Sequence, residues 1–189
     1  MKIRVYYHRS DLDGKASAAI IKYYYVNDVT SVHSLSFIGY EYGDILEFND
    51  VEEFDIVYVV DICFKPFSKM IELQKKVKQF VWIDHHYSSI EEYKNSGIYI
   101  AGKLGEKENT KSACYLTWEY FYPGKEISKA LHYIHLLDVF LHRDNLDVLS
   151  FYEAADLNLI DVYRHEWFSI ITGNESKFLE YLEQGRLLL

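Results

Sequence analysis

The 189-residue chain has little cysteine: Cys63 and Cys114 lie far apart and form no CxxC pair. This excludes a disulfide framework and a zinc ribbon, and no His–acid arrangement supports either residue as a nucleophile. No apolar run approaches the roughly 20 residues needed to span a bilayer, and the N-terminus lacks the apolar region of a secretory signal. We therefore expect a cytoplasmic protein with no membrane partner.

A run of basic residues is also missing, and the formal net charge is −9 at pH 7. Proteins that hold long nucleic acid without sequence preference usually present a basic face, because phosphate neutralisation supplies most of that affinity. The small basic grouping Lys75, Lys76 and Lys78 stands among apolar residues. A long duplex is therefore not an expected partner, although acidity can also serve only to keep the surface soluble.

The sequence does contain strand-like and helix-like segments in alternation. Apolar, strand-like runs typical of strands buried on both faces occur at Ile3–Tyr7, Val32–Ile38, Ile56–Asp61, Phe80–Ile83 and Ile98–Ala101. Helical patterns occur at Lys15–Val26, Phe67–Lys76, Ser88–Tyr93, Ser112–Tyr122, Ile127–Leu137, Asp161–Ile171 and Ser176–Leu187. Ser88 and Glu91 form a capping-box pattern. This order predicts an α/β fold, a parallel β-sheet flanked by helices, followed by a helical C-terminal segment.

Polar residues with metal-binding side chains follow the first strand, in the segment His8-Arg9-Ser10-Asp11-Leu12-Asp13-Gly14. In parallel sheets, sites form where the carboxyl end of a strand turns into a helix. A loop is not bound by strand alternation, so Asp11 and Asp13 can both point into one pocket. Gly14 permits a tight turn at the start of the helix. The alternative is that the two acids only cap the helix and that His8 is exposed.

Two further strands end in the same way. Asp61 closes the third strand, and Asp84-His85-His86 directly follows the fourth. Alone, the aspartate fits a turn and the histidines fit ordinary internal hydrogen bonding. Three strand ends that deliver carboxylates and imidazoles to the same edge of a sheet favour a site instead.

Metal chemistry explains this combination of side chains. Two divalent ions about 3.5–4 Å apart can hold a phosphoryl group and stabilise the charge that develops on it. Such a pair needs a bridging carboxylate and terminal ligands on each side. Mixed carboxylate and imidazole ligands favour Mn²⁺ over Ca²⁺, and the chain has no thiolate cluster for zinc. We expect two Mn²⁺ ions, with Mg²⁺, Co²⁺ or Fe²⁺ as alternatives.

The ordered motifs resemble those of the DHH phosphoesterase superfamily over roughly residues 3 to 140. The matching positions are His8-x-x-Asp11-x-Asp13-Gly14-x-x-Ser17-Ala18, Asp61, Asp84-His85-His86 and Asp138. The resemblance implies a hydrolase with metal ligands in three roles: His8 and Asp11 on one ion, Asp13, His85 and Asp138 on the other, and Asp61 on both. It also implies that His86 faces the substrate phosphate and that Asp84 orients the loop, a catalytic pair beside the ligands.

The details of the resemblance suggest a branch and a domain organisation. The Asp11–Gly14 form is closer to the nanoRNase and exopolyphosphatase-related branch than to the pyrophosphatases, although two residues separate His8 from Asp11 where many relatives have three. We expect a DHH-type catalytic domain at 1–140 and a helical extension at 141–189 that resembles the linker to an absent substrate-binding domain. The apolar tail Leu187–Leu189 either packs on its own core or pairs with a second copy as a homodimer.

Two further residues are weaker candidates for substrate contacts. Ser112 belongs to a segment, 109–116, similar to a helix start of the family, where a helix N-terminus could receive an anion. His142 shares a helical spacing with His135 and Asp138, so it is either an extra ligand or phosphate contact or an ordinary structural histidine.

Three functions are compatible with these residues. The first is hydrolysis of phosphodiesters or phosphomonoesters in short oligonucleotides or nucleotides. The acidic chain favours such a small phosphorylated substrate over a long duplex. The second is hydrolysis of phosphoanhydrides by the same site, as in pyrophosphatases and exopolyphosphatases. The third is a non-catalytic metal-binding module for assembly or regulation. The complete ligand set argues against the third, because clustered carboxylates without a cation repel one another.

Overall fold

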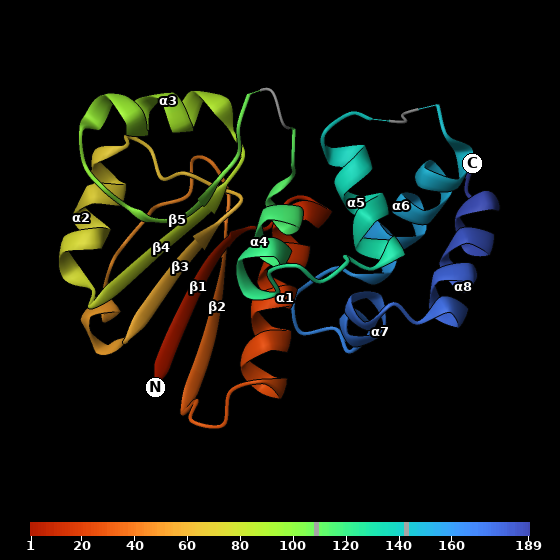
Figure 1. Ribbon diagram of the computed structural model, residues 1–189, viewed down its shortest axis with the longest axis horizontal. Helices are drawn as coiled ribbons and strands as arrows, with labels where there is room; N and C mark the ends of the chain where they lie inside the picture. Colours follow the sequence, from red (N-terminus) through yellow and green to blue (C-terminus); the bar gives the residue numbers. More distant parts are fainter. Residues whose placement is uncertain (108–109, 142–143) are drawn as a thin grey trace.

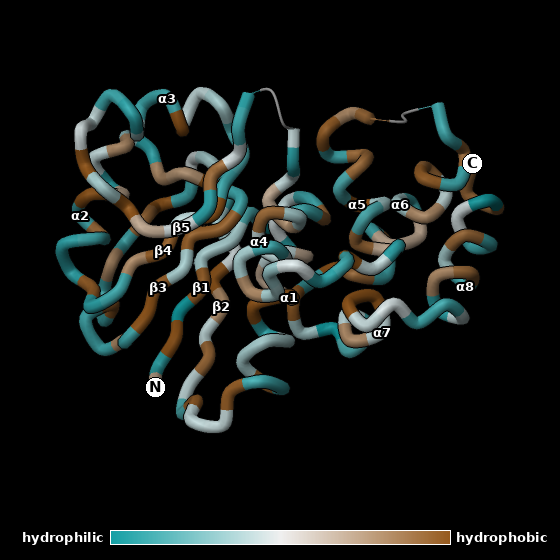
Figure 2. The backbone as a smooth tube through the Cα atoms, viewed as in Figure 1, coloured by the Kyte–Doolittle hydropathy of each residue, from teal (hydrophilic) through white to brown (hydrophobic). Residues whose placement is uncertain are grey.

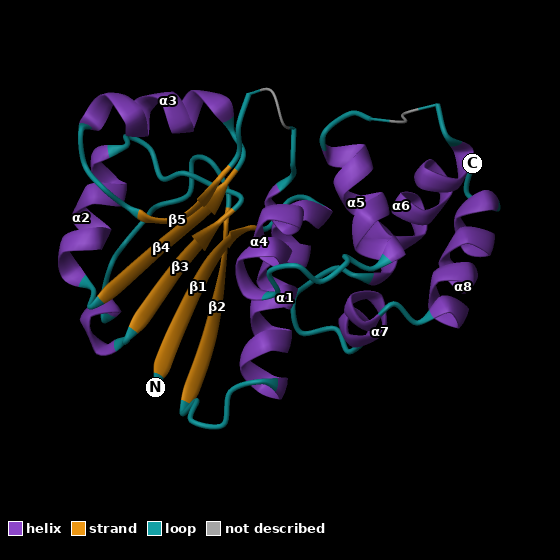
Figure 3. Ribbon diagram, viewed as in Figure 1, coloured by secondary structure: helices purple, strands orange, loops and turns teal. Residues whose placement is uncertain are grey.

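The computed structural model describes residues 1–107, 110–141 and 144–189. Its centre is a five-stranded sheet in the order β2-β1-β3-β4-β5, with every pair of neighbours parallel (Figures 1 and 3). The strands are β1 (Lys2–His8), β2 (Ser34–Tyr40), β3 (Ile56–Val60), β4 (Gln79–Asp84) and β5 (Ala101–Leu104). The predicted α/β class with flanking helices and a helical C-terminal segment is confirmed.

Helices cover both faces of the sheet. The helices are α1 (Leu12–Asn27), α2 (Ser68–Lys76), α3 (Tyr87–Ser96), α4 (Ala113–Phe121), α5 (Lys129–Asp138), α6 (Leu146–Asn158), α7 (Glu166–Thr172) and α8 (Glu175–Arg186), with a short 3-10 turn at Val51–Glu53. In Figure 1, α2 and α3 lie on one side of the sheet, α1 and α4 on the other, and α5–α8 beyond them.

Alternate strand residues enter two separate hydrophobic clusters, because successive side chains of a strand point to opposite faces. Val5 and Val60 pack in the cluster that includes α1, α4 and the C-terminal helices, whereas Val59 and Trp82 pack in the cluster under α2 and α3. Both faces of the sheet are therefore dry, which explains the nearly continuous apolar runs of its strands. Figure 2 shows hydrophobic stretches running along these strands.

The register of the strands brings three strand ends level with one another. Tyr7 pairs with Val60, and Val60 pairs with Ile83. The residues that follow are His8, Asp61 and Asp84, so they lie side by side at the carboxyl edge. The chain leaves β1 toward β2 on one side and reaches β3 on the other, and this reversal of strand order is where ligands bind in open α/β sheets.

Several sequence-based boundaries need correction. Strand β2 starts at Ser34 rather than Val32, β5 starts at Ala101 where the prediction ended, and α7 starts at Glu166 rather than Asp161. The capping box was wrong: α3 begins at Tyr87, its N-cap is His86, and no side chain caps it by a hydrogen bond. Ser88 therefore lies inside the first turn of the helix.

Helix α6 was not predicted. Its segment carries apolar side chains around much of its circumference, so it lacks the single stripe that marks a surface helix. It is held at its start by Asn145, whose side chain accepts hydrogen bonds from the backbone N–H groups of Asp147 and Val148. Val148 and Phe151 are fully buried, because α6 is packed between neighbouring helices.

The C-terminal helix α8 packs against the protein's own core. Phe178 and Leu182 are buried there, whereas Leu187 is 89% exposed. Gly185 lies so close to α6 that a Cβ atom at this position would be 1.6 Å from the Ser150 carbonyl oxygen. Within the described ranges, no helix is long and apolar enough to cross a membrane.

We expect Gly185→Ala to lower the free energy of unfolding by about 1–3 kcal/mol, because the added methyl group forces α8 away from the α6 backbone. Chemical denaturation measures this loss. Glu183→Ala is the matched control, since Glu183 is exposed on the same helix and its replacement should leave stability nearly unchanged. Equal stability of the two variants would contradict the close packing.

Candidate metal centre

The carboxyl edge of the sheet gathers all six predicted metal ligands. The structure places them in two groups whose ligand atoms lie within 4.8 Å of one another: His8, Asp11 and Asp61; and Asp13, His85 and Asp138. A third such group joins Asp61 with His85 and His86. The side chains come from the ends of β1, β3 and β4, from the start of α1 and from the end of α5.

The first group forms where β1 turns into α1. The His8 Nδ1 atom lies 2.6 Å from Asp11 Oδ2 and 3.7 Å from Asp61 Oδ2. Asp11 is also the N-cap of α1, since its Oδ1 accepts a hydrogen bond from the Gly14 N–H at 2.9 Å. The two interpretations of Asp11 are therefore compatible, because each uses a different oxygen. A Cβ atom at Gly14 would be 2.1 Å from the His8 carbonyl oxygen, so only glycine allows this turn.

The second group is held by a helix that lies far away in the sequence. The carboxylate of Asp13, which is buried, accepts hydrogen bonds from the backbone N–H groups of Ala113 (2.7 Å) and Cys114 (2.9 Å) at the start of α4. Free N–H groups and the helix dipole stabilise negative charge there. The His85 Nε2 atom lies 3.3 Å from Asp138 Oδ2 and 3.9 Å from Asp13 Oδ2.

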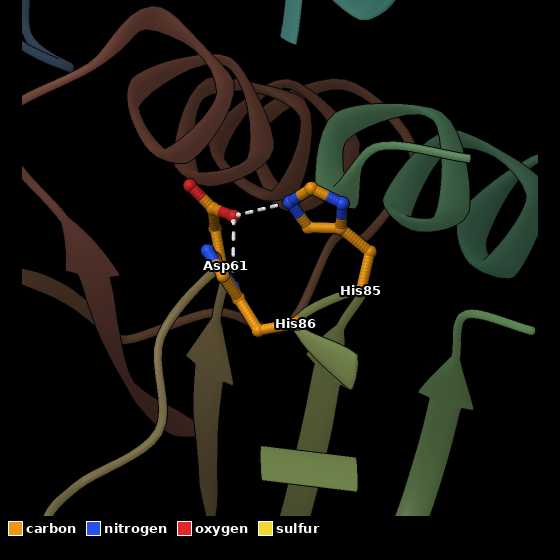
Figure 4. A group of neighbouring side chains, drawn as sticks. All are labelled: Asp61, His85 and His86. Carbon is orange, nitrogen blue, oxygen red and sulfur yellow. Dashed lines mark ion pairs between the residues drawn. The ribbon is translucent and has the colours of Figure 1, made fainter. Parts of the chain in front are cut away.

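Asp61 lies between the two groups and is almost completely buried, with 1% of its surface exposed. One of its oxygens, Oδ2, faces His8, and the other, Oδ1, lies 3.4 Å from His85 Nε2 and 3.9 Å from His86 Nδ1 (Figure 4). Among the described residues, neither oxygen has a hydrogen-bond partner. Its φ angle of 57° is left-handed, a conformation that costs energy in a residue other than glycine and that concentrates at functional sites.

Asp84 organises the loop that carries the two histidines. Its Oδ1 accepts hydrogen bonds from the backbone N–H of His85 at 2.7 Å and of His86 at 3.1 Å, and it lies 2.7 Å from His86 Nδ1. Asp84 is fully buried, whereas 38% of the His86 side chain is exposed. The carboxylate thus fixes a ring that faces the opening of the site.

The pKa values of the cluster record an excess of buried negative charge. Burial, together with the neighbouring Asp13 charge, raises the pKa of Asp61 well above its ordinary value and that of Asp138 to about 9. The adjacent carboxylate of Asp11, and that of Asp61 further away, raise the pKa of His8 to about 11. Each shift means that the site favours binding a proton, whose positive charge reduces the repulsion among the carboxylates. A bound cation would reduce that repulsion in the same way.

These residues fit divalent cations. The donors are carboxylate oxygens and imidazole nitrogens, and Asp61 offers two buried oxygens that receive no hydrogen bond from the described part of the chain. Hard and intermediate ions such as Mg²⁺ and Mn²⁺ prefer this donor set. Thiolates are excluded from it, because Cys63 and Cys114 are buried and burial raises the pKa of both thiols.

Glu41 is a neighbour of the site that the sequence did not reveal. It follows β2, and its Oε1 lies 3.3 Å from the His8 Nε2 atom, on the opposite side of the ring from Asp11. The only signal in the sequence was that an acid follows β2, whose carboxyl end lies at the same edge as those of β1, β3 and β4. A carboxylate behind a ligating imidazole fixes the orientation of the ring.

The weaker sequence candidates lie differently. Ser112 has no exposed surface: its N–H donates to His135 Nδ1 at 3.2 Å, and its hydroxyl lies 3.3 Å from Cys114 Sγ. The side chain therefore presents no open face for the expected substrate contact. Burial lowers the pKa of His135 to about 4, which keeps its ring neutral and able to accept this bond. His142 lies outside the described residues.

Comparisons with known proteins find distant likenesses. No family model matches the chain. It is 30% identical over 191 residues to the uncharacterised protein R106 of Acanthamoeba polyphaga mimivirus, a match that covers 94% of this chain but only 44% of that relative. The chain thus spans less than half of the relative's length.

Two solved structures show similarity in chain path. One is RecJ from Thermus thermophilus in complex with Mn²⁺, with a TM-score of 0.41 and 15% identity over 85% of this chain and 22% of that one. The other is an exonuclease RecJ bound to manganese, with a TM-score of 0.42 and 13% identity over 99% of this chain and 60% of that one.

We expect Asp61→Asn to stabilise the metal-free protein at neutral pH. Because the pKa of Asp61 is raised in the folded state, the folded protein holds a proton that the unfolded chain loses above about pH 4, so folding becomes less favourable as pH rises. An amide carries no charge and removes this penalty.

Thermal melts in chelator at pH 5 and pH 7.5 measure this effect. The gain from Asp61→Asn should be larger at pH 7.5 than at pH 5. Asp55→Asn, which alters a partly exposed carboxylate at the other end of β3, should show no such gain. A destabilised Asp61→Asn protein at pH 7.5 would contradict the proposed repulsion.

Proposed function

We propose that this protein is a metal-dependent phosphoesterase that hydrolyses phosphodiester or phosphomonoester bonds of short oligonucleotides or nucleotides. The observation that carries the proposal is the position of Asp61. Its two buried oxygens have no hydrogen-bond partner within residues 1–107, 110–141 and 144–189, and they face two different groups of ligands. A carboxylate in this position suits a bridge between two cations.

The assignment of ligands follows the two groups. His8 and Asp11 would hold one ion, Asp13, His85 and Asp138 would hold the second, and Asp61 would contribute to both. Two bound cations, of which Mn²⁺ suits the donors best and Mg²⁺ or Co²⁺ also fit, would supply Lewis acidity toward phosphoryl oxygens and a lower pKa for water. Two contacts keep these ligands in place: Asp84 holds the loop of His85 and His86, and the N–H groups at the start of α4 hold Asp13.

His86 is the residue that we place against the substrate phosphate. Burial lowers its pKa, but the hydrogen bond to Asp84 together with the negative charges of Asp84 and Asp61 outweighs burial and raises the pKa above the ordinary value. The ring therefore keeps a positive charge further into the neutral range. Since Nδ1 faces Asp84, the Nε2 side of the partly exposed ring is left to meet an anion.

The charge of the chain supports a small substrate. With a net charge of −9 and no basic run, the protein lacks the means to hold a long duplex, whereas cations at the centre can hold one phosphate group. In this proposal residues 1–140 form the catalytic unit, and residues 141–189 form a helical extension beside it.

The proposal predicts two bound ions and metal-dependent hydrolysis. Calorimetric titration with Mn²⁺ should give two ions per chain, and a screen of nucleotides and short oligonucleotides should give activity that chelator removes. Asp61→Ala should lower that activity at least a hundredfold, because the stabilisation of the transition state by the metal pair amounts to several kcal/mol.

Asp55→Ala is the control for this screen, since it removes a carboxylate from the opposite end of the same strand. Its activity and metal stoichiometry should equal those of the unaltered protein. Full activity of the Asp61→Ala protein, or no Mn²⁺ binding by the unaltered protein, would refute the proposal.

A second prediction concerns Glu41 as the residue that orients His8. We expect Glu41→Ala to weaken Mn²⁺ binding about 10- to 100-fold, since outer carboxylates contribute this much to metal affinity. Glu41→Gln, which keeps an oxygen for the ring N–H, should lose less. Glu47→Ala removes the same charge from an exposed position of the same loop and should bind Mn²⁺ normally. Equal losses in Glu41→Ala and Glu47→Ala would point to net charge instead.

A further inference from the structure

Helix α5 ends beside the metal centre in an unusual way. After Asp138, the Phe140 N–H donates to the Leu137 carbonyl at 3.0 Å, and the Leu141 N–H donates to the Leu136 carbonyl at 2.9 Å. This pair of bonds is the Schellman motif, which ends helices through one residue in the left-handed conformation. That residue is usually glycine, and here it is Phe140, with φ 61°.

Phenylalanine is unfavourable at this position on two grounds. A side chain with a Cβ atom is strained in the left-handed conformation, where glycine is not. The ring is also 67% exposed, although a large apolar side chain is normally stabilised by burial. Glycine is the residue that usually takes this conformation. A strained, exposed aromatic next to a site is a reason to look for a ligand that uses it.

A hollow of about 410 Å³ opens at this ring. It is lined by Leu137, Asp138, Phe140, Leu149 and Tyr152. Asp138 belongs both to this lining and to the second group of metal ligands, so the hollow adjoins the metal centre directly.

The lining determines which part of a substrate fits there. It has two aromatic rings, two leucines and one carboxylate, and no lysine or arginine among the described residues. Among the described lining residues, a second phosphate would meet the Asp138 carboxylate and no cation, so this lining favours a neutral group. Nucleobases are neutral and planar, and they stack on aromatic side chains with little regard to sequence.

We propose that this hollow binds the base of a nucleotide, stacked on Phe140, while its phosphate lies at the metal centre. The inference rests on the proposed function and adds a substrate class to it. Phe140 is then a specificity-determining residue, and helix α6 contributes to recognition through Leu149 and Tyr152.

The test compares two ligands that differ only in the base. Dissociation constants of AMP and of ribose 5-phosphate are measured on the Mn²⁺-loaded protein. The unaltered protein should bind AMP at least tenfold more tightly, because stacking on an aromatic side chain contributes about this much or more per base. Equal affinity for both ligands would overturn the base-binding hollow and leave the proposed function intact. Failure to bind either ligand would overturn both.

The variant Phe140→Gly separates recognition from folding. It should weaken AMP binding tenfold or more and leave ribose 5-phosphate binding and Mn²⁺ stoichiometry unchanged, while the melting temperature rises because the left-handed strain is relieved. Phe140→Tyr should retain AMP binding. Leu157→Ala, which shortens an exposed apolar side chain of α6, is the control and should change neither affinity. An equal loss of both ligands in Phe140→Gly, or no loss of AMP, would overturn the proposal.

Discussion

The structure depends on how the fold accommodates several buried carboxylates close together around Asp61. Asp61 is buried beside Asp13 and near Asp11 and Asp138, and each of these carboxylates would rather be hydrated or paired with a cation. The fold compensates for part of this charge with the N–H groups of α4 and of the α1 start, and with the imidazole of His8. The remainder stays uncompensated at Asp61, which is why the cluster suits cations better than any arrangement of hydrogen bonds alone.

The parallel sheet makes this concentration possible. Because β1, β3 and β4 are neighbours in register, their carboxyl ends deliver side chains to a single edge, at the point where the strand order reverses. The helical segment completes the site from the other side. Helix α5 brings Asp138 to the edge, and α6 brings Tyr152 to the adjoining hollow.

Much of this arrangement was predictable from sequence, and the reasons are local. His8, Asp61 and Asp84 could be placed together because each follows an apolar strand and parallel strands end on one edge. Asp138 came only from the family resemblance, since a helical aspartate carries no such signal. Glu41 was missed because its role depends on its position next to the Nε2 atom of His8, which only the folded structure shows.

Other features could not be predicted because tertiary packing decides them. Helix α6 has no single apolar stripe, since it is buried on several sides. The importance of Phe140 arises from a backbone angle that a sequence does not display. The strand and helix boundaries shifted by a few residues for the same reason: hydrogen bonds to neighbouring segments, rather than local preference, determine where β5 and α7 begin.

The contact between Asp13 and the start of α4 also bears on the order of events during folding. It joins residues 100 and 101 positions apart in the chain, and contacts of such long range form slowly because much of the intervening chain must be ordered first. All five β-strands are synthesised before the N–H groups of Ala113 and Cys114, the partners of Asp13, exist. The centre therefore matures after the sheet, and a cation that arrives earlier meets a set of acids without its final geometry.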